Sequence, residues 1–157
     1  MIWFEDVEVG QRARFGRYEV TREEIVEFAG QWDPQPFHLD EAAARESFFG
    51  GLIASGWHTG AMFIRMVVDH AVAGTAVVGA AGFDDLRWRR PVRPGDVLSV
   101  ETEVLDKTPS RSRADLGSVR VAGRVLDARG EVVMSLVSIV LYRRRPGAPL
   151  GAAAGDP

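Results

Sequence analysis

Two residues that can move protons lie five positions apart in a stiff stretch of the chain. Asp33 and His38 enclose Pro34 and Pro36, and both prolines restrict the backbone between them. A carboxylate and an imidazole held together can bind one water and pass its protons in either direction near neutral pH. Taken alone, however, Asp-Pro and Gln-Pro are common turn dipeptides, and the spacing by itself favours an ordinary turn.

A second pattern with chemical potential follows at Ser55 and Gly56. Serine is a preferred N-cap, and the unpaired N–H groups at a helix N-terminus can hold a carbonyl oxygen that gains negative charge. Glycine at position 56 would let a flat acyl group approach. In isolation, a capped helix without a ligand explains this pattern better. Together, the two patterns indicate proton transfer beside an activated carbonyl, as in acyl-thioester chemistry.

The remaining histidines do not indicate a metal site. His58 lies just inside the predicted helix, where it could be a third polar group of the site or simply bond to the backbone. His70 lies near the far end of that helix, where a cation suits the helix dipole. The three histidines are widely spaced, and the chain has no cysteine, so we predict that no metal is bound.

Arginines gather before the turn at Pro94, and three more end the last predicted strand at 143–145. Such groups can bind the phosphates of coenzyme A or of a phosphopantetheine carrier. A solvated run of charge explains them equally well. The candidates for phosphate contacts are Arg87, Arg89, Arg90 and Arg93.

Size and composition limit the possible functions. The 157 residues fit one domain of common size. The net charge of -3 argues against nucleic-acid binding. No signal peptide is visible, so the cytoplasm is the expected location. The apolar stretch 57–74 contains two histidines and two charged residues, so a buried helix is expected there and no membrane span.

Several helices can be predicted from capping and periodicity. Thr21 and Glu24 have the spacing of a capping box that starts a helix ending near Asp33. Asp40 can cap a short helix over 41–47. The long helix, 57–73, is apolar nearly all round and is predicted to be buried. The first helix has its predicted apolar face at Ile25, Phe28, Ala29 and Trp32.

The rest of the ordered chain reads as strands. A first strand is expected near 13–20, and the later strands are expected at 76–88, 98–104, 119–125 and 132–142. The last strand is apolar on both faces, which predicts an interior place in the sheet. Segregated helices and strands predict an α+β fold, with a curved antiparallel sheet around the single long helix. Surplus apolar surface predicts pairing with a second copy.

The run Asp33-Pro34-Gln35-Pro36-Phe37-His38 resembles the D-x-N-P-x-H signature of the MaoC-like (R)-specific enoyl-CoA hydratases. The F-x-x-x-I-x-x-G run at 49–56 and the segment 90–96 extend the resemblance. It implies a single hot-dog domain over 1–145, followed by a disordered Gly/Ala/Pro-rich tail over 146–157. It also implies a homodimer or a larger assembly of dimers, with the acyl tunnel at the subunit interface. No cofactor is implied beyond the coenzyme A or phosphopantetheine of an acyl-CoA or acyl-carrier-protein substrate.

The same resemblance implies roles for particular residues. Asp33 and His38 would activate the water that adds to a trans-2-enoyl thioester, or that leaves a 3-hydroxyacyl thioester. The Gly56 N–H would bind the thioester carbonyl. The chain departs from the family at three positions: Gln35 replaces Asn, Ser55 replaces His, and Ile64 replaces Ser. The possible accessory residues are Gln35, Ser55, His58 and Thr59.

Two alternatives remain open at this point. A hot-dog thioesterase would use Asp33 as base and the same helix N-terminus as oxyanion hole. A non-catalytic acyl-thioester-binding subunit is compatible with Ile64 in place of the family's serine. In either case, Trp57, Phe63 and Phe83 are bulky enough that we expect them to line or block the tunnel.

Overall fold

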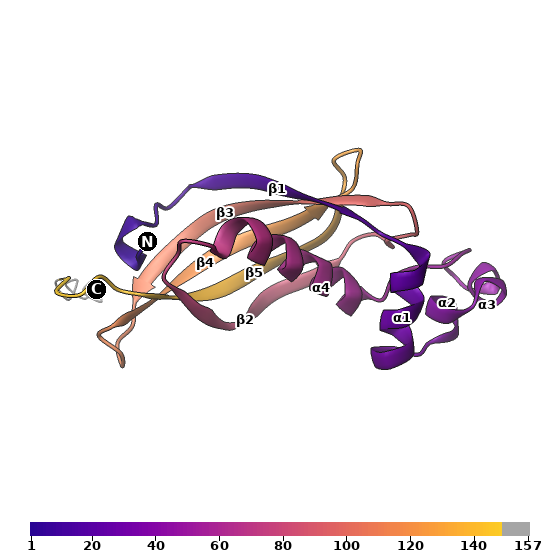
Figure 1. Ribbon diagram of the computed structural model, residues 1–157, viewed down its shortest axis with the longest axis horizontal. Coiled ribbons are helices and arrows are strands. Elements are labelled where there is room, and N and C mark those ends of the chain that lie inside the picture. The colour runs from indigo at the N-terminus through magenta and orange to yellow at the C-terminus, as the bar shows by residue number, and fades with distance from the viewer. Residues whose placement is uncertain (149–157) are drawn as a thin grey trace.

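The structure, a computed structural model, describes residues 1–148. Its antiparallel sheet has the strand order β1-β3-β4-β5-β2, and one long helix, α4, lies along one face of the sheet (Figure 1). The described elements are η1 (Phe4–Asp6), β1 (Arg12–Glu19), α1 (Arg22–Trp32), α2 (Pro36–Leu39), α3 (Glu41–Glu46), α4 (Gly56–Val67), η2 (Val68–Val72), β2 (Val77–Trp88), β3 (Val97–Pro109), β4 (Leu116–Leu126) and β5 (Val132–Arg143).

The predicted α+β architecture is confirmed. The four later strands all form, and β5 lies between β4 and β2, in agreement with its apolar character on both faces. Register shifts at bulges in β1, β2, β3 and β5 strengthen the twist of the sheet. The sheet therefore curves enough to pack along α4.

Gly16 marks the place where β1 crosses α4. Its φ of +79° lies in the left-handed region, and the register of β1 against β3 shifts between Phe15 and Tyr18. A β-carbon at Gly16 would lie only 2.6 Å from the sulfur of Met66. Glycine thus permits both the bulge and the close approach of the strand to the helix.

The core lies between α4 and the sheet. Met62, Phe63 and Met66 project from α4 and are almost fully buried. They belong to one apolar cluster with Leu98 and Val100 of β3, among other strand residues. Burying apolar side chains from both layers is the main source of stability in such a two-layer fold.

The prediction of a helix buried all round is wrong for the isolated chain. Trp57 is 63% exposed, Ile64 43% and Val68 52%. The sheet covers only one side of α4, so the opposite side faces outward. The helix also changes form near its end, where the π-helical turn η2 replaces the predicted α-helical residues.

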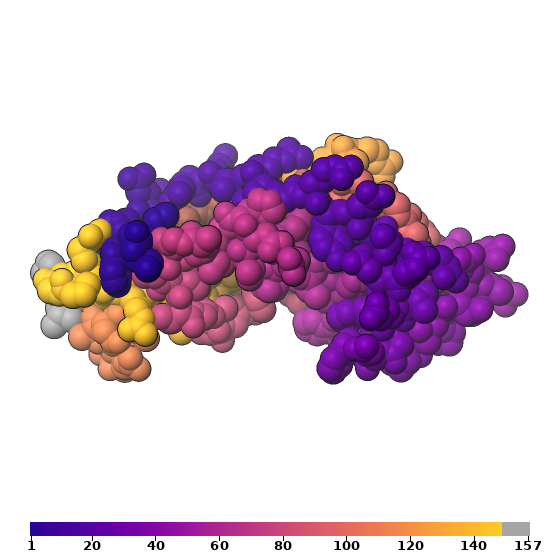
Figure 2. Space-filling view, viewed as in Figure 1, coloured from indigo at the N-terminus to yellow at the C-terminus, as the bar shows by residue number. Residues whose placement is uncertain are grey.

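The helices α1, α2 and α3 gather at one end of the molecule, away from the two termini (Figure 2). Thr21 caps α1 by accepting the Glu24 N–H, as predicted, whereas the Glu24 side chain bonds the Thr21 and Tyr18 hydroxyls. Trp32 was expected on the apolar face of α1 but is exposed, because that helix end projects beyond the sheet. The stretch from Asp33 to His38 was expected to be loop, but the single turn α2 begins within it, at Pro36.

Two further sequence predictions concern the ends of the chain and the membrane. Residues 149–157 of the predicted tail lie outside the described residues. Residues 146–148 are described and are separated from the end of β5 by two residues, and the Ala148 N–H donates to the Arg145 carbonyl. Among residues 1–148, no helix is long and apolar enough to cross a membrane.

Candidate active site

Asp33 stands at the C-terminal end of α1, where its backbone N–H donates to the Ala29 carbonyl. Both carboxylate oxygens are occupied. Oδ2 accepts the Ser55 hydroxyl at 2.6 Å, and Oδ1 accepts the Gln35 side-chain amide at 2.8 Å. The Pro34 geometry ends the helix here, so the carboxylate is held at the start of a turn and points toward residues that come later in the chain.

His38 lies on α2 and is only 4% exposed. Its Nδ1 is 2.8 Å from the Ile53 carbonyl oxygen, and its Nε2 is 3.4 Å from Asp33 Oδ2. A carbonyl oxygen can only accept, so Nδ1 must carry the proton of this hydrogen bond. In the neutral ring, Nε2 then presents a lone pair beside the Asp33 carboxylate.

The pKa of Asp33 is lowered from its usual value. The hydrogen bond from Ser55 is the largest cause and that from Gln35 is the second; partial burial opposes them, and the charge of His38 adds to the lowering. Asp33 is therefore a carboxylate at neutral pH and a weak base. His38, with Nδ1 protonated, has a lone pair on Nε2 that can take a proton from water.

Ser55 joins this pair to the N-terminus of α4. Its fully buried hydroxyl donates to Asp33 and accepts the Trp57 N–H at 3.2 Å. Gly56 is the first residue of α4, and within residues 1–148 its N–H donates no hydrogen bond. The two patterns recognised in the sequence thus meet in one place, across 22 residues of chain.

The site lies in a cavity of about 700 Å³. Asp33, His38, Ser55 and Gly56 all line it, together with Thr59. Most of the remaining wall is aromatic or cationic. A partly apolar cavity with a few convergent polar groups is the usual form of a small-molecule site.

Comparison with known proteins identifies the relationship. A family model described as a MaoC like domain matches residues 6–126. The chain belongs to the MaoC-like dehydratase family. It is 32% identical over 140 residues to the 3-hydroxybutyryl-CoA dehydratase of Methylorubrum extorquens. The aligned region covers 87% of this chain and 85% of that protein.

Solved structures of the family agree with the fold. The MaoC-like dehydratase of Rhodospirillum rubrum is 47% identical, with a TM-score of 0.84 over 96% of this chain and 100% of that one. The R-hydratase PhaJ1 of Pseudomonas aeruginosa is 29% identical, with a TM-score of 0.71 over 98% and 97% of the two chains. These likenesses confirm the predicted hot-dog fold.

The positions at which this chain departs from the family signature have specific contacts. Gln35 and Ser55, which replace Asn and His, both donate to Asp33. The Thr59 hydroxyl is 3.4 Å from the Ser55 carbonyl, one helical turn away. The substituted residues therefore keep the carboxylate fully hydrogen-bonded. Ile64, which replaces serine, lies further along α4 with its side chain partly exposed.

His58 is placed apart from the other accessory candidates. Its ring stacks on Phe28 with centroids 4.7 Å apart, and it does not line the cavity in the described part of the chain. Its Nδ1 is buried without a hydrogen-bond partner among the described residues. Burial lowers the pKa of His58, against the opposing charge of Glu24, so this imidazole is held in the neutral form.

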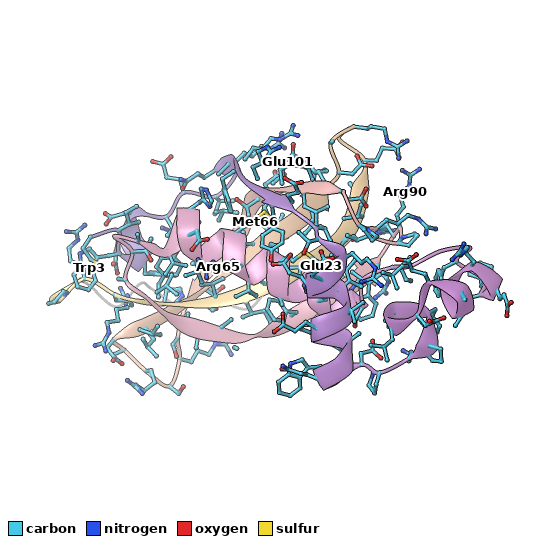
Figure 3. The ribbon with its side chains drawn as sticks, turned by 45° about the vertical axis from the view of Figure 1, so that its right-hand side comes forward. Trp3, Glu23, Arg65, Met66, Arg90 and Glu101 are labelled. Atoms are coloured by element: carbon cyan, nitrogen blue, oxygen red, sulfur yellow. The ribbon has the colours of Figure 1, made fainter. Side chains whose placement is uncertain are left out.

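The four candidate arginines do not share one environment. Arg89, Arg90 and Arg93 line the cavity, whereas Arg87 does not and bonds the neighbouring Leu86 carbonyl. Arg90, labelled in Figure 3, forms an ion pair with Glu131. Arg93 donates to the Phe49 carbonyl at 2.5 Å, and Arg89 donates to the Ser135 hydroxyl at 3.2 Å.

Of the three bulky residues expected to line or block the tunnel, one lines the described cavity. Trp57 lines the cavity. Phe63 instead packs in the core beside Gly123, and Phe83 lies partly exposed on β2; neither belongs to the described cavity wall.

Sequence reasoning missed two contributors to the site. The Ile53 carbonyl orients His38, and Trp88 covers the first turn of α4. Neither has a sequence signal, because a backbone carbonyl is present at every residue and Trp88 reads only as the end of a strand. Among residues 1–148, no group of three or more His, Asp or Glu side chains is arranged to hold a metal ion.

Proposed function

We propose that this protein adds water to a trans-2-enoyl thioester, or removes it from the corresponding 3-hydroxyacyl thioester. The observation that carries the proposal is the convergence of Asp33, His38 and the free Gly56 N–H through the Ser55 hydroxyl. Membership of a family whose relative is named 3-hydroxybutyryl-CoA dehydratase supports the same reaction class.

In the hydration direction, one water donates one hydrogen bond to His38 Nε2 and another to the Asp33 carboxylate. His38 takes a proton as the water oxygen bonds to C3. The electrons of the double bond move toward the thioester carbonyl, and the Gly56 N–H stabilises the resulting enolate oxygen. The protonated His38 then returns a proton to C2. Hydroxyl at C3 and hydrogen at C2 balance the added water, and dehydration is the reverse.

Asp33 acts in this mechanism mainly through its charge. Its lowered pKa keeps it ionised, so it orients the water and favours the imidazolium that forms on His38. The hydrogen bond from Nδ1 to Ile53 keeps the ring in the tautomer that this role requires.

The test is hydration of a short trans-2-enoyl-CoA, which is measured as the loss of the absorbance of the enoyl group. His38→Ala and Asp33→Asn should each lower kcat/KM by about 10²–10⁴-fold. The matched controls are His70→Ala and Asp69→Asn, because these residues contact only η2 and α4 neighbours or the Phe15 ring. Full activity in both site variants would eliminate this mechanism.

The same assay separates the two alternatives. A thioesterase would release free thiol from a saturated acyl-CoA, and Asp33→Asn would abolish that release. A binding subunit would retain the thioester without turnover of either substrate.

The coenzyme A or phosphopantetheine arm is proposed to enter past Arg89 and Arg93. Neither guanidinium has a carboxylate partner among the described residues, so both keep a charge that phosphate can neutralise. We keep the substrate general at this point, as an acyl-CoA or acyl-carrier-protein thioester. A cytoplasmic location stays a prediction.

A homodimer is part of the proposal. β2 is an edge strand that exposes Val78 and Phe83, α4 exposes Ile64, and η2 exposes Val68. A second copy would cover these apolar side chains and pair the free strand edge. Phe83→Asp should shift the protein toward monomer in analytical ultracentrifugation, whereas Leu105→Asp, at an exposed apolar position on β3, should not. Unchanged dimer in Phe83→Asp would exclude this interface.

A further inference from the structure

The end of β2 brings Trp88 directly against the first turn of α4. The indole Nε1 donates to the Gly56 carbonyl oxygen at 2.8 Å. The ring also meets Trp57 edge-on, with centroids 5.3 Å apart and planes at 80°. Trp88 lines the same cavity as Asp33 and His38. The N-terminus of α4 is therefore completed by a residue 32 positions after Gly56 in the chain.

The indole also fills the space beside the Gly56 α-carbon. A β-carbon at position 56 would lie 2.5, 2.7 and 2.8 Å from three atoms of the Trp88 ring system. Those separations are well inside van der Waals contact, so a larger residue at 56 would have to displace the indole. The packing of Trp88 is therefore sufficient by itself to require glycine at this position, and the approach of an acyl group stays a prediction.

Gly56 is thus held from two directions. Ser55, on its N-terminal side, is bonded to Asp33, and Trp88 contacts its α-carbon and its carbonyl oxygen. The two contacts hold Gly56 on either side of its α-carbon: Ser55 belongs to the peptide whose N–H is free, and Trp88 bonds the carbonyl of the next peptide. A hydrogen-bond donor acts on a developing charge only when its position is already set before the reaction.

We propose that Trp88 is a positioning residue for the thioester carbonyl: it packs on Gly56 and holds the first turn of α4 so that the Gly56 N–H meets the carbonyl oxygen. The kinetic part of this inference rests on the proposed hydration reaction. The packing part concerns only residues 56 and 88 and stands without any turnover.

A stability cycle tests the packing. Gly56→Ala, Trp88→Ala and the double variant are unfolded in urea beside the wild type. Gly56→Ala should lower the midpoint when Trp88 is present. In the Trp88→Ala background the same change should have no cost or raise the midpoint, because alanine is a better helix former than glycine once the indole is gone. Equal losses in the two backgrounds would overturn the packing assignment.

Kinetics test the positioning. Trp88→Ala should lower kcat for a short enoyl-CoA by about tenfold with a smaller change in KM, because the donor remains but is less well placed. Trp88→Phe, which keeps a ring but loses the Nε1 donor, should fall between that variant and the wild type. Trp32→Ala removes an exposed tryptophan at the end of α1 and is the matched control.

The outcomes are distinguishable. Wild-type turnover with an unchanged kcat in folded Trp88→Ala would overturn the positioning role alone. Absence of turnover in the wild type would remove the proposed reaction and the kinetic role that rests on it, whereas the stability cycle would still decide the packing of Trp88 on Gly56.

Discussion

The two ends of the molecule use carboxylates in opposite ways. At the end that carries η1 and the last residues of β5, labelled by Trp3 in Figure 3, Glu5 accepts from the buried Arg144 at 3.0 Å, and Asp6 pairs with Arg145 at 2.7 Å. At the end that carries α1–α3, Asp33 accepts from the neutral groups of Ser55 and Gln35.

The pKa of the carboxyl group is lowered at both ends, by different means. For Glu5, partial burial raises the pKa, but hydrogen bonds from the Arg145 backbone and the Arg144 guanidinium outweigh it. For Asp33, the Ser55 hydroxyl is the main cause. Arginine neutralises Glu5, whereas neutral donors leave the charge of Asp33 available to a water and to His38. The ion pairs of Glu5 and Asp6 join the N-terminal residues to the segment after β5, whereas the hydrogen bonds to Asp33 leave a charged carboxylate in the cavity.

The largest effect on stability is expected from breaking the ion pair between Glu5 and Arg144. Arg144→Ala should lower the free energy of unfolding by about 2 kcal/mol, because it removes the buried guanidinium that pairs with Glu5. The measurement is urea denaturation, with turnover assayed on the folded variant. Arg65→Ala, which removes an exposed ion pair with Asp69, should cost under about 1 kcal/mol. Loss of kcat in folded Arg144→Ala would contradict the assignment of stability to one end of the molecule and catalysis to the other.

A smaller effect separates the arginines near the site. Arg89→Ala should raise KM for an acyl-CoA by about tenfold, because a charge-assisted contact to phosphate is lost. Arg87→Ala is the control, since Arg87 does not line the described cavity. Steady-state kinetics at two salt concentrations give the comparison. Equal KM changes in the two variants would argue for a general charge effect instead of a phosphate contact.

The subtlest effect is on pH dependence. Ser55→Ala removes the main cause of the lowered pKa of Asp33, so that pKa should rise. Asp33 acts as a carboxylate and loses that role as pH falls through its pKa, so the acid limb of the kcat/KM profile should move to higher pH. Ser118→Ala, on β4 and bonded only to the Thr108 carbonyl, should leave the profile in place. An unmoved acid limb in Ser55→Ala would mean that another group controls it.

The N-cap residues predicted the starts of the helices correctly. Thr21 and Asp40 cap α1 and α3 as expected, and Ser55 caps α4. These signals depend on contacts within a few residues, which the sequence contains in full. The exposed side of α4 could not be predicted in the same way, because apolar periodicity does not say whether the sheet or a second chain covers a given face.

The amino-acid sequence by itself determined which groups could do chemistry: the Asp33 and His38 pair, the proline-stiffened turn between them, and a serine-capped helix opened by glycine. Only the tertiary structure decided how they act together. The Ser55 bond to Asp33, the Ile53 carbonyl on His38 and the indole of Trp88 on Gly56 each join residues 15 to 32 positions apart. Contacts over such separations depend on how the elements pack, and no local pattern records them.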